Sequence, residues 1–273
     1  MKLTYAVVFA VSIILPKAAS GEMIGNPGTQ IGEKNLFVGI EYARGTHIYD
    51  LDTRGLDTIS ERVTFKVTTG LTDWLDLYIR AGGASLALGY KDNDYVYKTQ
   101  NLTQKWGNSS KNFESDFSAG FGAGTRLRLL NFPDSRMRVF FQGGGFIFKT
   151  KDDIRWDLSD GSNVTKNREI KWADFYGALG IAKRTDYLDI SIGVGFSEIW
   201  WEISDENLVN VGTTTTKNQI PNRDSFELRN PVFGFIGFDF VLPYEYRISV
   251  QAAVRSIDEA EFSVAISQGL EKD

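Results

Sequence analysis

Strict alternation between apolar and polar residues is the feature that most constrains how this chain of 273 residues can fold. In segment 75–81 the odd positions are apolar and the even positions polar: Leu75, Leu77, Ile79 and Ala81 against Asp76, Tyr78 and Arg80. A repeat of two residues is the period of a β-strand with two different faces. The same pattern recurs in ten segments: 36–43, 62–67, 75–81, 118–127, 138–147, 173–181, 188–197, 232–240, 246–255 and 261–266. The sequence therefore predicts an all-β protein.

The connections between these segments alternate in length. Four are short, near Gly70–Asp73, Asn131–Ser135, Lys183–Asp186 and Leu242–Tyr244, and a final tight link follows near Ile257–Glu259. Four are long and polar, over residues 45–60, 85–115, 149–169 and 204–225. Tight turns on one rim and long loops on the other are typical of outer-membrane barrels. We predict a closed antiparallel up-and-down transmembrane β-barrel of ten strands, or of eight or twelve if one segment is misassigned.

The first twenty residues predict export. Lys2 precedes an apolar run from Leu3 to Leu15, and small residues follow at Ala18-Ala19-Ser20, which is the layout of a signal peptide. The run is shorter than the roughly 20 residues that a membrane-spanning helix needs. We expect a signal peptide at 1–20, a short periplasmic segment at 21–33 and the barrel at 34–270.

Composition limits the chemistry. The chain has no cysteine, which excludes disulfides and thiolate metal sites. Removing Lys2 and Lys17 from the 30 basic residues leaves 28 against 35 acidic ones, so the net charge is −7. An acidic exported chain gives no reason to expect nucleic acid as a partner, and we expect no cofactor.

Several stretches resemble the small bacterial outer-membrane β-barrel proteins: GLTDWLDLYIRAGG, FSAGFGAGTRLRLL, DISIGVGFS and the closing AEFSVAISQGL. The resemblance implies a place in the bacterial outer membrane, with its lipid and the barrel assembly machinery as partners. It also implies a terminal aromatic residue, and here the chain departs from the pattern, because no aromatic follows Phe262. Aromatic belts are expected at the interfaces, with Trp74 near a tight turn and Trp200 and Trp201 near a long loop.

If the apolar faces meet lipid, the opposite faces line a lumen. A charge network is predicted there, made of Lys66, Asp76, Arg80, Arg126, Arg128, Arg138, Asp189, Asp239 and Arg247. We expect Asp76 to pair with Lys66, Arg126 or Arg138, and lumen glycines to make room for Phe140, Phe146, Trp172 and Tyr176. Mixed charges in so narrow a barrel predict a salt-bridged, largely plugged lumen. The alternative is a narrow porin-like channel whose arginines favour anions.

Catalysis has little support. Ten-stranded outer-membrane barrels include the omptin proteases, and the only histidine, His47, precedes Asp50 and Asp52. No motif surrounds these residues, so we interpret His47 as a polar residue in a solvated loop and predict that the protein is not an enzyme. We expect surface interaction, with a possible ligand at loops 85–115 and 149–169, or a role in envelope structure. A surface enzyme is the remaining alternative.

Overall fold

The computed structural model describes residues 35–51, 54–90, 113–157, 163–211, 214–220, 227–228 and 230–270. The predicted signal peptide and the segment 21–33 lie outside this part. Ten long strands form the wall: β1 (Leu36–Leu51), β2 (Arg54–Thr72), β3 (Leu75–Tyr90), β5 (Ser118–Phe132), β6 (Met137–Asp157), β7 (Asn163–Arg184), β8 (Leu188–Val211), β11 (Val232–Val241), β12 (Tyr246–Ser256) and β13 (Glu259–Leu270). Three short strands add to the wall: β4 (Phe113–Glu114), β9 (Thr214–Ile220) and β10 (Glu227–Leu228).

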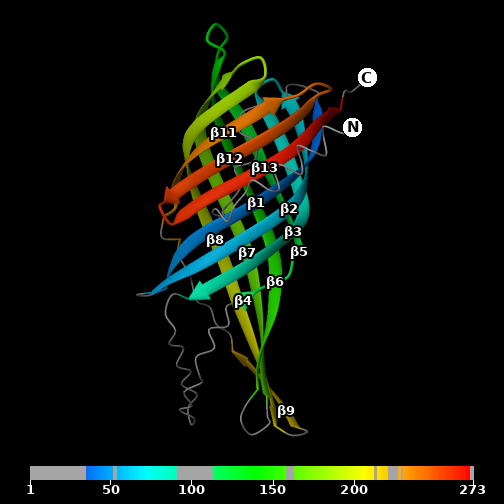
Figure 1. Ribbon diagram of the computed structural model, residues 1–273, viewed down its shortest axis with the longest axis vertical. Helices are drawn as coiled ribbons and strands as arrows, with labels where there is room; N and C mark the ends of the chain where they lie inside the picture. Colours follow the sequence, from blue (N-terminus) through cyan, green and yellow to red (C-terminus); the bar gives the residue numbers. More distant parts are fainter. Residues whose placement is uncertain are drawn as a thin grey trace.

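The ten long strands close into a barrel (Figure 1). Each pairs antiparallel with its neighbours, and β1 pairs with both β2 and β13, which joins the first strand to the last. Leu36 lies opposite Leu270, so the ends of the described barrel share one rim. The predicted ten-stranded closed barrel is confirmed. No helix within the described ranges is long and apolar enough to cross a membrane.

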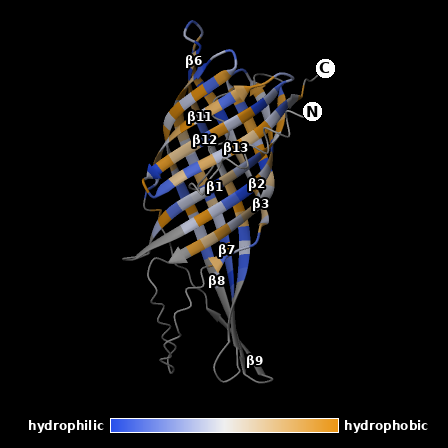
Figure 2. Cartoon of the chain, in the orientation of Figure 1, coloured by the Kyte–Doolittle hydropathy of each residue, from blue (hydrophilic) through white to orange (hydrophobic). Residues whose placement is uncertain are grey.

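Burial follows the alternation of the sequence, with apolar residues on the outside and polar residues inside. In β3, Leu77 and Ile79 are 39% and 63% exposed, whereas Asp76 and Arg80 are 1% and 3% exposed. Figure 2 shows the result as alternating apolar and polar bands along the strands. An apolar exterior around a polar interior is the architecture of outer-membrane barrels. The predicted class and outer-membrane localisation are confirmed at the level of the fold.

Exposed aromatic residues lie near both rims of the barrel, where its apolar outer surface ends. Exposed Trp74, Tyr187 and Tyr244 lie beside the tight turns. At the opposite rim, Trp200 is 59% exposed, and exposed Glu202 comes two positions further along the same face of β8. Trp201 departs from the predicted aromatic belt because it is buried and points into the barrel.

The strands differ greatly in length, and this corrects the predicted loops. β11 has 10 residues, close to the roughly 9–11 that cross a bilayer, whereas β8 has 24. Most of the predicted loop 149–169 is strand, because β6 and β7 continue past the band, and β8 and β9 pair beside them. We call this projection the β6–β9 ribbon; it forms the narrow end of the molecule in Figure 1. Apart from residues 52 and 53, which lie outside the described part, the predicted loop 45–60 is the paired ends of β1 and β2.

The predicted loop 85–115 is only partly visible. Residues 85–90 belong to β3, and β4 pairs with that strand through Ala87 and Leu88. Residues 91–112 lie outside the described part of the chain. The tight turns are as predicted: β2 and β3, for example, are joined through Asp73 and Trp74.

Candidate functional site: the barrel lumen

The rim with the tight turns carries the first layer of lumen charges. Asp76 on β3 pairs with Arg126 on β5 at 3.9 Å, one of the three partners expected from the sequence. Arg138 on β6 pairs with Asp189 on β8 at 2.8 Å, and Arg184 reaches the other oxygen of that carboxylate at 4.0 Å. These contacts link β3 to β5 and β6 to β8 inside the wall.

The second layer is centred on Glu41 of β1. Its carboxylate accepts a hydrogen bond from Lys66 Nζ at 3.1 Å and another from Arg80 Nη1 at 3.3 Å. Glu41 and Arg80 are both at least 97% buried. Lys66 therefore pairs with Glu41 rather than with Asp76.

Two ion pairs form the third layer, further from the tight turns. Arg62 on β2 pairs with Asp174 on β7, and both side chains are fully buried. The guanidinium of Arg62 also lies 4.9 Å from the centre of the Phe146 ring. Arg255 on β12 pairs with Glu261 on β13 at 3.4 Å. Ion pairs between strands are thus present at three successive levels of the lumen.

Three members of the predicted network have different surroundings. Asp239 is 1% exposed and lies opposite Asp189 in the β8–β11 ladder. Arg247 stacks over the Phe37 ring at 4.3 Å. Arg128 sits where the β5–β6 register shifts, and its backbone N–H donates to the carbonyl of Trp74.

Aromatic side chains fill the space between these charges, as expected for Phe140, Phe146, Trp172 and Tyr176, all of which are buried. The hydroxyls of Tyr78 and Tyr176 meet across the lumen, and Gln142 Nε2 donates to Tyr176 at 3.1 Å. Lumen glycines make this possible: a Cβ on Gly144 would lie 2.3 Å from the Tyr78 hydroxyl. Bare backbone on the wall leaves room for a ring in the interior.

An apolar layer lies in the lumen at the ribbon end. We call it the aromatic cap, and its larger buried members are Tyr49, Leu86, Leu88, Phe113, Phe146, Phe148, Ile170, Trp172, Ile199 and Trp201. Trp172 lies at its centre, with ring centres of Phe148, Tyr49 and Trp201 at 5.9, 6.1 and 5.9 Å. The members come from β1, β3, β4, β6, β7 and β8, so the cap spans the lumen from several sides.

The position of His47 differs from the one inferred from the sequence. It lies in β1 rather than in a solvated loop, and it is fully buried beside Tyr49 and Trp172. Neither ring nitrogen has a hydrogen-bond partner. No group of three metal-ligating residues occurs in the part of the chain that the structure covers.

Further buried polar atoms lie in the lumen on β2. The hydroxyls of Thr58, Ser60 and Thr64 on β2 face the lumen and have no hydrogen-bond partner within the protein. Buried polar groups are almost always hydrogen-bonded, and ordered water supplies the bond when protein does not. These three hydroxyls and the ring of His47 form a group of buried polar atoms on β1 and β2.

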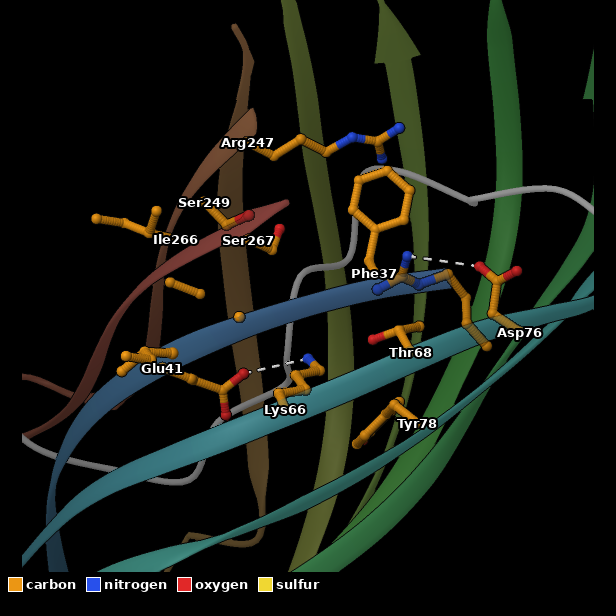
Figure 3. Close-up of a pocket in the computed structure, with 14 residues that line it drawn as sticks. Phe37, Glu41, Lys66, Thr68, Asp76, Tyr78, Arg247, Ser249, Ile266 and Ser267 are labelled. Atoms are coloured by element: carbon orange, nitrogen blue, oxygen red, sulfur yellow. Dashed lines mark hydrogen bonds and ion pairs between the residues drawn. The ribbon is translucent and has the colours of Figure 1, made fainter. Parts of the chain in front are cut away.

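A cavity opens near the tight-turn rim, where β1, β2, β3 and β12 begin or end (Figure 3). Its side-chain lining combines charged, hydroxyl and aromatic groups: Phe37, Glu41, Lys66, Thr68, Asp76, Tyr78, Arg126, Arg247, Ser249, Ala265 and Ser267. The cavity has a volume of about 40 Å³ and is open to solvent. Four residues of the predicted charge network thus line one hollow, together with Glu41: Lys66, Asp76, Arg126 and Arg247.

No family model matches the sequence, and no curated protein matches it. Solved outer-membrane barrels are similar in structure. The translocator domain of autotransporter NalP from Neisseria meningitidis has a TM-score of 0.46 and 8% identity, covering 99% of this chain and 95% of that one. The transport unit of the autotransporter AIDA-I from Escherichia coli has a TM-score of 0.42 and 9% identity, covering 98% and 97%. The outer membrane protease OmpT from Escherichia coli has a TM-score of 0.37 and 10% identity, covering 88% and 97%.

Sequence reasoning found Phe146 and Trp172 as lumen residues but missed the rest of the aromatic cap. Leu86 and Leu88 were assigned to the predicted loop 85–115, whereas they are buried apolar residues on the inward face of β3. The available signal was a change of pattern within β3: the inward positions change from Asp76, Tyr78 and Arg80 to Ala84, Leu86 and Leu88. Such a change marks the depth at which the lumen becomes apolar.

Proposed function

We propose that the protein is a non-conducting outer-membrane barrel that contacts other molecules at the cell surface through the β6–β9 ribbon. The observation that carries the proposal is the aromatic cap. Trp172 is 2% exposed and Trp201 is 8% exposed, and their rings pack against residues from across the barrel. A ten-stranded barrel is only slightly wider than the eight-stranded kind, which side chains can fill.

The ion pairs support the same reading. Each of the three charged layers neutralises an arginine or lysine with a carboxylate from another strand. Such pairs hold the wall strands together and leave few charges to attract a permeating ion.

Planar-bilayer recording of the purified, folded protein tests the proposal. The wild-type protein should give no steady channels, and Trp172→Ala combined with Trp201→Ala should give measurable conductance because two ring-sized gaps open in the cap. Trp200→Ala is the matched control, since Trp200 faces outward and is 59% exposed. Folding of each variant is checked by heat-modifiable gel mobility. Steady anion-selective channels in the wild-type protein would refute a closed lumen and favour the porin-like alternative.

The ribbon supports the second half of the proposal. Its outward face carries ion pairs, Lys149–Glu169 at 2.7 Å and Lys171–Glu202 at 3.1 Å, in place of the apolar residues found lower on the same strands. Within the described residues, β9 pairs only with β8, so its other edge has free backbone hydrogen-bonding groups. Exposed strand edges and charged faces are suited to contacts with other chains.

Cysteine labelling on intact cells tests where the ribbon lies. The chain has no native cysteine, so Lys151→Cys and Arg136→Cys each introduce a single thiol. A membrane-impermeant maleimide should label Cys at 151 on the ribbon but not Cys at 136, which lies in a tight turn at the opposite rim. Labelling of the turn alone would reverse the orientation and remove the ribbon from the cell surface.

A further inference from the structure

The cavity at the tight-turn rim contains one cation in an unusual situation. Lys66 and Arg126, which also line it, pair with the carboxylates of Glu41 and Asp76. Arg247 has no carboxylate within ion-pair distance among the described residues, and its guanidinium instead lies over the Phe37 ring. In Figure 3 the side chain of Arg247 extends across the hollow toward that ring.

Hydroxyl groups accompany Arg247 on the same wall. Ser249 lies two residues further along β12, is 6% exposed and has no hydrogen-bond partner for its hydroxyl. Ser267 lies opposite Arg247 in the β12–β13 ladder, and Figure 3 draws the two serines side by side. A guanidinium beside hydroxyl donors is the set of groups that binds carboxylate or phosphate oxygens.

The charges of the lining favour an anion. Lys66, Arg126 and Arg247 carry three positive charges, whereas Glu41 and Asp76 carry two negative ones. Both carboxylates are already engaged with basic side chains, so neither is placed to bind a cation alone. The charges of Asp239 and Asp189 act on Arg247 as well and offset part of its charge, while its guanidinium contacts the Phe37 ring.

We propose that this cavity binds a small oxyanion, a carboxylate or a phosphate, that enters from the tight-turn side of the barrel. Arg247 supplies the charged donor, and the hydroxyls of Ser249 and Ser267 complete the site. The site lies at the opposite end of the lumen from the aromatic cap, so it is a blind pocket rather than part of a path. It goes beyond the proposed function, because a barrel that does not conduct can still bind an anion here.

Isothermal titration calorimetry on the folded, detergent-solubilised full chain tests the site, with sodium phosphate and sodium acetate as separate probes. At least one probe should bind, and the preferred probe identifies the oxyanion class. Arg247→Gln should weaken binding about tenfold or more, since it removes a charge-assisted hydrogen bond. Arg247→Lys should retain part of the affinity because it keeps the charge and loses the planar fork.

Two further variants keep the test specific. Arg136→Gln removes an arginine from an exposed turn outside the cavity and should leave binding unchanged. Ala265→Leu fills the cavity without changing its charge and should also abolish binding, with folding checked by heat-modifiable mobility. Absence of binding by both probes, or equal binding by wild type and Arg247→Gln, would overturn the proposal. Bilayer conductance is a separate readout, so this result is independent of whether the lumen conducts.

Discussion

The buried ion pair of Arg62 and Asp174 offers the sharpest test of how the lumen stabilises the barrel. Their side chains are 2% and 0% exposed. Asp174→Asn keeps the shape of the side chain but removes its charge, which leaves Arg62 buried without its carboxylate. Removing one partner of a buried pair costs about 3–5 kcal/mol. The stacking of Arg62 on Phe146 favours the lower end, about 3 kcal/mol.

The same chemistry at the surface supplies the comparison. Arg136 and Asp186 pair at 2.6 Å between two tight turns, with side chains 60% and 72% exposed. Asp186→Asn should cost no more than about 1 kcal/mol, because solvent screens exposed pairs. Urea unfolding in lipid vesicles, followed by tryptophan fluorescence, measures both variants. Equal costs for the two variants would refute the idea that burial sets the energy of the lumen pairs.

Three more outcomes follow from the fold. Ile79→Arg should cost about 2–4 kcal/mol of unfolding free energy in vesicles, because Ile79 is 63% exposed on the lipid face. Gly144→Ala should lower thermal stability by pressing on the Tyr78 hydroxyl, and Tyr78→Phe added to it should recover part of the loss; no recovery would exclude this contact as the cause. In the ribbon, burial raises the pKa of Glu169, but hydrogen bonds from Lys149 and Lys151 together outweigh it and lower the pKa overall. The stability from these contacts is present above the unfolded-state pKa and is lost as pH falls through the lowered value. An NMR titration of the carboxyl should show the midpoint rising in Lys149→Ala and would contradict the assignment if it stayed fixed.

The strand pattern was predictable where lipid acts on one face. Leu77 and Ile79 must be apolar there, while Asp76 and Arg80 must avoid lipid. This requirement produces the alternation of apolar and polar residues in the sequence. Beyond the membrane both faces of a strand meet water, so the requirement disappears. Segment 149–157, KTKDDIRWD, has no clear alternation and was therefore predicted to be a loop, although it is part of β6.

The partners inside the lumen were only partly predictable. The sequence places Asp76, Lys66 and Arg126 on one inner surface, but it does not fix the register between strands. Register decides that Asp76 lies opposite Arg126, and the curvature of the wall brings Glu41 to Lys66 and Arg80. His47 was misplaced for the same reason as the ribbon, because β1 continues beyond its last clear alternation.

The aromatic rings of the lumen lie on glycine positions of the wall, and this arrangement determines how the barrel could change state. The ring of Tyr78, for example, packs against the wall at Gly144, which has no side chain. In the described residues, the side chains that fill the lumen therefore belong to the strands that form the wall. There is accordingly no separate plug domain among them that could swing aside on a hinge. Within the described residues, the filling of the lumen changes only when individual side chains rotate. A single methyl group added to the wall, as in Gly144→Ala, is therefore enough to change how the rings pack.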